Sequence, residues 1–172
     1  MQYNIHPIFV HFPIALLCLY SIIQIIPFKK WLPKIAWTDV GLIMLVVGVL
    51  GAFVALMTGD IAEEMVRAND SLVELHAFFA GASTWLYGAL LIGELSRIIT
   101  AQSFIGKVSL QKAKAVLVII KKILHDSFFA KIIVVVALLS IGMTGLLGGA
   151  LVYGTTADPF TGIVLKIFGI AI

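Results

Sequence analysis

Three histidines are the residues of this sequence whose type and spacing suggest chemistry. His6 and His11 lie at the beginning of one apolar stretch, and His76 lies at the beginning of another. Imidazole nitrogens bind metal ions and haem iron, and a histidine inside a membrane segment is costly unless it serves a function. The fourth histidine, His125, lies among lysines, and we expect it to be solvated.

His11 and His76 are expected to lie at the same depth in a membrane. Pro7 suits the first position of a helix, which makes His11 about the fifth residue of that helix. The segment Ser71–Glu74 has the sequence of a capping box, which makes His76 about the fifth residue of its own helix. His6 lies roughly 140° around the helix axis from His11, so these two side chains cannot share a face.

The residues below the two imidazoles leave room for a flat cofactor. Small side chains follow each histidine by one or two helical turns, and the rest of the lining is mainly apolar. This is the environment of a buried haem b held by two histidines. The expected site therefore consists of two ligands for haem or a metal ion and three lining residues: His11, His76, Ala15, Ala80 and Ser83.

Two alternatives remain open at this point. His6 is a less favoured ligand, because a residue at the start of a helix is expected to cap it or to contact a neighbouring helix. His11 and His76 can also serve only as hydrogen-bond donors to backbone carbonyls, such as the Phe9 carbonyl that Pro13 leaves without a helical partner.

The composition indicates the elements that must position these histidines. Of 172 residues, 61% are apolar and 12% are charged, whereas a soluble domain has about 45–50% apolar and about 25% charged residues. Nucleic-acid binding is not indicated, and the single cysteine, Cys18, allows no internal disulfide. The sequence predicts one all-α membrane domain, a four-helix bundle with spans of roughly 20 residues or more at about 6–28, 39–58, 72–99 and 129–153.

The charged residues predict the orientation of the bundle. Basic residues gather in the connections between the first two spans and between the last two, whereas acidic residues gather at the opposite ends. By the positive-inside rule, the lysine-rich connections face the cytoplasm and both termini lie outside a prokaryotic plasma membrane. Glu94 and Arg97, three residues apart, are expected to pair. The basic residues of these connections are Lys29, Lys30, Lys34, Arg97, Lys107, Lys112, Lys114, Lys121, Lys122 and Lys131. The acidic residues at the opposite ends are Asp60, Glu63, Glu64, Asp70, Glu74 and Asp158, and only Arg67 and Lys166 are basic residues on that side.

The segment 107–125 is too short in its apolar run to be a fifth span. Apolar residues recur there at helical spacing, and Lys114, Lys121 and Lys122 lie off that face. This pattern predicts an amphipathic helix at an anionic inner leaflet; the alternative is a solvated loop that extends the fourth span.

An internal repeat relates the two halves of the chain. The segments 48–60 and 145–158 both contain Gly-x-Leu-Gly followed by a small residue, and both reach a threonine and an aspartate where the span ends. We therefore expect two helical hairpins of the same orientation, related by an axis along the membrane normal. Small residues such as Gly145 and Gly149 allow close helix packing.

Several motifs resemble one known family. The opening His6-Pro-Ile-Phe-Val-His11-Phe-Pro, then Thr58-Gly59, His76 and Gly148-Gly149 with Tyr153, are similar to the predicted-membrane-protein family called domain of unknown function 2231. The lysine-rich insert between the third and fourth spans departs from that pattern. Because members of the family are fused in some proteins to c-type cytochrome or Rieske-type domains, the resemblance implies electron transfer at the outer face.

The sequence thus predicts a small b-type cytochrome-like subunit that is not an enzyme by itself. It would exchange electrons with a c-type cytochrome or a Rieske-type carrier, and its acidic outer connections suit a basic partner. It would act as a homo-oligomer or within a larger membrane complex. The alternatives are a cofactor-free structural or assembly subunit and a membrane protein whose histidines bind a metal ion.

Overall fold

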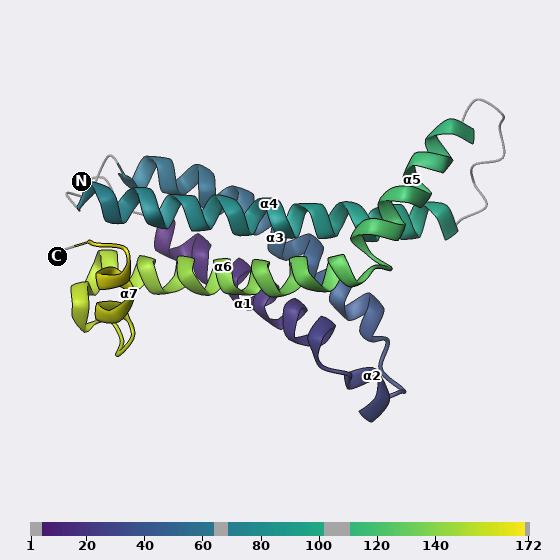
Figure 1. The fold of residues 1–172 in the computed structure, drawn as a ribbon, viewed down its shortest axis with the longest axis horizontal. Helices are drawn as coiled ribbons and strands as arrows, with labels where there is room; N and C mark the ends of the chain where they lie inside the picture. The colour runs from purple at the N-terminus through teal and green to yellow at the C-terminus, as the bar shows by residue number, and fades with distance from the viewer. Residues whose placement is uncertain (1–4, 64–68, 102–110, 171–172) are drawn as a thin grey trace.

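The computed structural model describes residues 5–63, 69–101 and 111–170, and within them every regular element is a helix (Figure 1). Four of these helices are long and apolar enough to cross a membrane. The predicted all-α fold with four membrane helices is therefore confirmed. The helices are α1 (His6–Ile25), α2 (Phe28–Trp31), α3 (Trp37–Glu63), α4 (Asp70–Ala101), α5 (Gln111–Leu124), α6 (Phe128–Tyr153), the 3-10 helix η2 (Gly154–Thr156) and α7 (Thr161–Ile167).

The ends of the long helices follow local rules. Pro7 lies in the first turn of α1, where its missing N–H costs nothing. The cap of α4 is Asn69, whose side-chain oxygen accepts a hydrogen bond from the Leu72 amide at 3.3 Å. The expected capping box at Ser71–Glu74 is therefore wrong, because a capping residue lies two positions earlier. The predicted start of the amphipathic helix at 107–110, with Lys107, lies outside the described residues, as does Glu64.

The four spans form two antiparallel hairpins that lie side by side, α1 with α3 and α4 with α6 (Figure 1). Small residues bring α1 and α3 together: a Cβ on Gly48 would lie 2.6 Å from a methyl of Leu17, and one on Gly51 would lie 3.2 Å from Pro13. This is the packing expected where lipid provides no hydrophobic drive for helix association.

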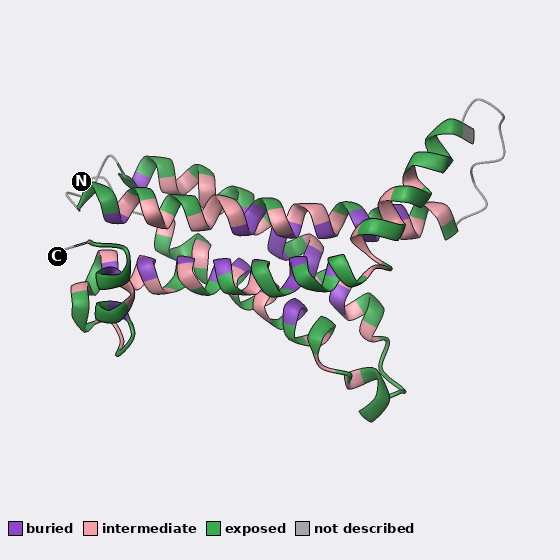
Figure 2. Ribbon diagram, in the orientation of Figure 1, coloured by how far each residue is buried: buried purple, intermediate pink, exposed green. Residues whose placement is uncertain are grey.

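Buried residues face the interior of the bundle, and apolar residues also cover its outside (Figure 2). Phe12, Ile43, Trp85 and Leu139, one from each long helix, are each at least 60% exposed. Such an apolar outer surface is unstable in water and is matched by the acyl chains of a bilayer. The predicted lipid environment therefore agrees with the structure.

A buried polar contact joins the two hairpins. The Ser21 hydroxyl on α1 lies 2.7 Å from the Tyr87 hydroxyl on α4, and both side chains are buried. Tyr20 packs edge-to-face on Tyr87 with ring centroids 6.2 Å apart. Since a buried hydroxyl is costly without a partner, this contact favours one register between the hairpins.

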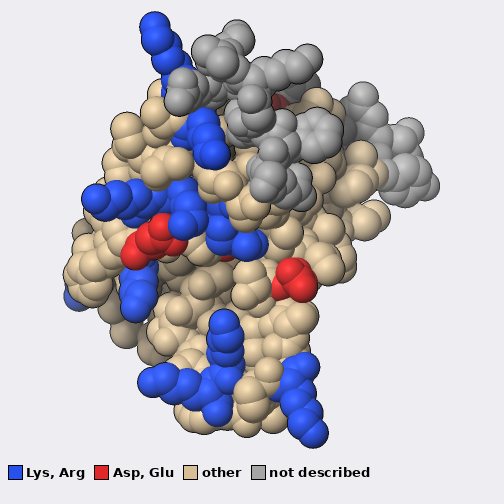
Figure 3. Space-filling view, turned by 90° about the vertical axis from the view of Figure 1, so that its right-hand side faces the viewer, with Lys and Arg blue, Asp and Glu red and all other residues tan. Residues whose placement is uncertain are grey.

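The two ends of the bundle carry opposite charge. We call the end with α2 and α5 the basic end, because the lysines of α2 and its following turn, of α5 and of the start of α6 gather there (Figure 3). We call the other the acidic end; α1 and α4 begin there, α3 ends there, and α7 lies against it (Figure 1). Asp60, Glu63, Asp70 and Glu74 are all exposed at the acidic end.

Candidate functional site

His76 lies on the inward side of α4 and reaches the facing helix α6. Its Nδ1 is 3.1 Å from the backbone carbonyl oxygen of Thr144. Because a carbonyl can only accept, Nδ1 carries the proton, and in the neutral ring Nε2 holds the lone pair. A Cβ on Gly148 would lie 3.2 Å from the Cε1 atom of His76, so the imidazole rests on a glycine that leaves room for it.

His6 makes the corresponding contact within the other hairpin. Its Nδ1 is 3.0 Å from the Thr58 hydroxyl oxygen on α3. That hydroxyl donates its own hydrogen to the carbonyl of Ala55 at 3.0 Å, so the His6 Nδ1–H is the donor to Thr58. A Cβ on Gly59 would lie 3.4 Å from the His6 ring.

The two hairpins therefore repeat one arrangement at the acidic end. In each, an imidazole from the first helix donates from Nδ1 to a threonine of the second helix and rests on a glycine of that helix. His6 and His76 are also close enough to interact electrostatically across the two hairpins. These contacts do not follow the register of the sequence repeat, which aligns Gly48 with Gly145 and Thr58 with Thr155, so the repeat stays a prediction.

His11 does not join this pair. It is exposed, and its Nδ1 donates to the carbonyl oxygen of Pro7 at 2.7 Å, one turn earlier in the same helix. Because His6 faces α3, His11 lies roughly 140° away on α1 and faces away from the neighbouring helices. Ala15, one turn further along the same face, is also exposed. The structure thus corrects the expected pairing of His11 with His76 and removes Ala15 from the lining.

The relative height of the helices explains why His6 replaces His11. Helix α4 begins farther out at the acidic end than α1 does (Figure 1). His76, the seventh residue of α4, therefore lies near the first turn of α1, which contains His6. Counting each histidine from the start of its own helix gives equal depth only if both helices begin at the same height, and they do not.

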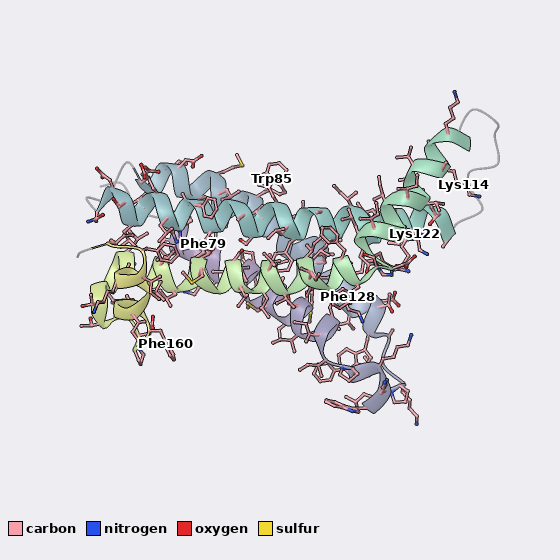
Figure 4. The ribbon with its side chains drawn as sticks, in the orientation of Figure 1. Phe79, Trp85, Lys114, Lys122, Phe128 and Phe160 are labelled. Atoms are coloured by element: carbon pink, nitrogen blue, oxygen red, sulfur yellow. The ribbon has the colours of Figure 1, made fainter. Side chains whose placement is uncertain are left out.

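The other two expected lining residues share the inward face of α4 with His76. Ala80 is half-buried and Ser83 is buried, and the Ser83 hydroxyl donates to the Ala80 carbonyl at 3.0 Å. On the outer side of this face, Phe79 lies between α4 and the C-terminal helices (Figure 4) and packs edge-to-face on Phe168, with centroids 6.1 Å apart.

Among the described residues, the donor set of this site is smaller than a structural metal ion takes. In the part of the chain that the structure describes, no group of three or more histidine, cysteine, aspartate or glutamate side chains is placed to hold a metal ion. A structural zinc site takes about four protein ligands. Haem iron needs only axial ligands from the protein, because the porphyrin supplies the other nitrogens. The imidazoles of His6 and His76 are partly buried at this end, whereas His11 is exposed.

A second polar cluster lies at the basic end. Glu94 is buried; its carboxylate lies 2.7 Å from the Arg97 Nε and 3.0 Å from the His125 Nδ1. The expected pairing of Glu94 with Arg97 is confirmed. The expected solvation of His125 is wrong, because the end of α5 approaches α4 closely at Gly93, where a Cβ would lie 2.8 Å from the Leu124 carbonyl oxygen. The cluster holds α5 against α4.

Comparison with known proteins adds no relative. The chain matches no protein-family model, no curated protein and no solved structure.

Proposed function

We propose that this protein is a membrane electron-transfer subunit of the b-type cytochrome kind, with His6 and His76 as the axial ligands of one haem. One observation carries the proposal: two partly buried imidazoles, one from each hairpin, each donate through Nδ1 to a threonine of the neighbouring helix. A metal-binding histidine commonly has its other ring nitrogen fixed in this way.

The haem would supply one-electron chemistry, and the chain's own residues would hold it. Thr58 and Thr144 accept the Nδ1 protons, which keeps both rings in the tautomer whose Nε2 can bind iron. Gly59 and Gly148 leave space for the rings beside the facing helices. His6 and His76 would hold the haem, and a haem held by two histidines would supply electron transfer rather than substrate chemistry.

The acidic end would be the docking surface for a redox partner. Four exposed carboxylates surround the helix ends nearest the histidines: Asp60, Glu63, Asp70 and Glu74. Opposite charge steers association, so a basic c-type cytochrome or a Rieske-type carrier is the proposed partner. In this proposal the acidic end faces outward from a prokaryotic plasma membrane, with α2 and α5 on the cytoplasmic side.

The first experiment is an absorption spectrum of the purified full chain, expressed with ample haem and recorded oxidised and reduced. The proposal predicts a Soret band and the spectrum of a six-coordinate low-spin haem. His76→Ala should abolish haem retention or convert the spectrum to that of a high-spin haem. A folded wild-type protein without a Soret band refutes the proposal.

A second candidate function is a cofactor-free structural or assembly subunit. The same hydrogen bonds favour it, because His6–Thr58 and His76–Thr144 each join two helices of one hairpin. In that case, both histidine variants would lower the stability of the bundle while the wild-type protein carried no chromophore. Chemical denaturation of the variants, read beside the spectrum, separates the two functions.

A further inference from the structure

Helix α5 is joined at its C-terminal end to a helix long and apolar enough to cross a membrane. Only residues 125–127 separate its end at Leu124 from the start of α6 at Phe128, and α6 is one of the membrane helices. The Glu94–His125 contact fixes this end of α5 to α4 at 3.0 Å. From there α5 projects away from the bundle (Figure 1).

Two different apolar faces run along α5. Leu117, Ile120 and Leu124 are half-buried, on the side toward the bundle. A second face is apolar and uncovered; we call it the apolar stripe, with exposed fractions of 55%, 57% and 46% for Val116, Ile119 and Ile123. These positions are three and four residues apart, so they form one row along the helix.

Lysines accompany the apolar stripe. Lys112, Lys114 and Lys122 are exposed, and among the described residues none of them has an ion-pair partner. Lys121 differs, because it pairs with Asp126 at 2.8 Å. Figure 4 shows Lys114 toward the free end of α5 and Lys122 toward its base, so the positive charge extends along the helix.

We propose that α5 binds the anionic phospholipid headgroups of the leaflet at the basic end, with its apolar stripe in the acyl boundary and its exposed lysines on lipid phosphates. An uncovered apolar row beside unpaired lysines matches the two layers of an anionic leaflet. This inference does not depend on the haem proposal.

The test measures how well lipid covers the apolar stripe in the full chain. The variant Ile119→Cys, in a Cys18→Ala background, is reconstituted in nanodiscs of phosphatidylcholine alone or with phosphatidylglycerol and alkylated with a water-soluble maleimide. Each lysine near an anionic surface contributes about fivefold to binding. We therefore expect alkylation to be about tenfold slower or more in the anionic discs, and added salt to reduce the difference.

Two charge variants make the test specific. Replacing Lys112, Lys114 and Lys122 by Gln should remove most of the lipid dependence. Replacing Lys29, Lys30 and Lys34 by Gln removes equal charge from the same end without changing α5, and should leave the dependence in place.

Three results would overturn the proposal. One is an equal alkylation rate in neutral and anionic discs. That result would indicate that a protein partner, and not anionic lipid, covers the apolar stripe. Another is an equal loss of the lipid dependence in both charge variants. The last is protection that rises with the number of chains per disc, which would assign the stripe to a second copy.

Discussion

At the scale of single residues, the position of the His76 imidazole depends on the absence of a side chain at Gly148. A Cβ there would lie 3.2 Å from the ring, and the branches of a valine would come closer still. We predict that Gly148→Val displaces the imidazole, lowers haem content about tenfold and destabilises the protein by about 1–3 kcal/mol. The absorption spectrum measures the haem content per protein, and denaturant unfolding measures the change in stability.

A matched control for this prediction lies one turn away on α6. A Cβ on Gly145 would have no neighbour within 4 Å, so Gly145→Val should leave the haem content unchanged. Equal haem content in the Gly148→Val protein and the wild type would contradict the role given to the glycine.

Sequence patterns predicted one half of the candidate site and not the other. His76, Ala80 and Ser83 recur at helical spacing on one face, and that face is inward in the structure. His6 and His11 were correctly placed on different faces of their helix, but their sequence did not indicate which face meets α3. A helix that is apolar all round has no polar side to mark its exterior, so the choice depends on the facing residues Thr58 and Gly59.

At the scale of elements, the apolar runs predicted the four long helices, but they did not predict the relative heights of those helices. Helix α3 continues past Thr58 to Glu63, and α4 begins at Asp70 under an Asn69 cap. Bilayer thickness limits the apolar run, whereas the helix ends where its backbone finds other partners. Because these helices extend beyond the predicted spans at the acidic end, His6 and not His11 lies near His76.

The position of α5 on α4 depends on Gly93. A Cβ there would lie 2.8 Å from both the Cβ and the carbonyl oxygen of Leu124, and the backbone of α5 cannot yield without moving the helix. We predict that Gly93→Ala destabilises the protein by about 1–3 kcal/mol and weakens the Glu94–His125 contact. Denaturant unfolding measures the first effect, and faster amide exchange in α5 measures the second.

Gly88 provides the control for this substitution, because a Cβ there has no neighbour within 4 Å. Gly88→Ala should be neutral or slightly stabilising, since alanine favours a helix over glycine. If the two alanine variants behave alike, the close approach of α5 to α4 does not contribute to stability.

The cap of α7 should respond to pH. The Thr161 hydroxyl and the Phe160 and Thr161 amides donate to the Asp158 carboxylate, and the hydrogen bond from the Thr161 hydroxyl is the main cause that lowers the pKa of Asp158. The cap is therefore fully formed above the ordinary pKa of an aspartate, and it is lost as the pH falls through the lowered pKa.

Amide NMR shifts of Phe160 and Thr161 test this expectation. They should titrate together with a midpoint below that of a free aspartate, and Asp158→Asn should abolish the titration. A midpoint at or above the ordinary value would show that the cap does not favour the ionised carboxylate.

At the scale of the whole molecule, the opposite charge of the two ends predicts its orientation in the membrane. We expect a membrane-impermeant thiol reagent added to intact cells to label Ser71→Cys and to leave Lys114→Cys unlabelled, in a Cys18→Ala background. Disrupted cells, in which both sites should react, control for reactivity. Labelling of Lys114→Cys in intact cells would reverse the orientation and place the acidic end in the cytoplasm.

The candidate site depends on the whole bundle, because His6 and His76 come from different hairpins and lie near one another only when both hairpins are assembled. The buried Ser21–Tyr87 contact, 2.7 Å between the hydroxyl oxygens, holds the hairpins together deeper in the membrane. A haem ligated by both histidines would add a coordinate link between them at the acidic end.

The most direct measurement of the central claim compares the haem spectra of His6→Ala and His11→Ala proteins. The account predicts that His6→Ala loses the haem or its low-spin spectrum, whereas His11→Ala retains both, because His11 is exposed and donates only to its own helix. Loss of the low-spin spectrum in His11→Ala, with an unchanged spectrum in His6→Ala, would contradict the account.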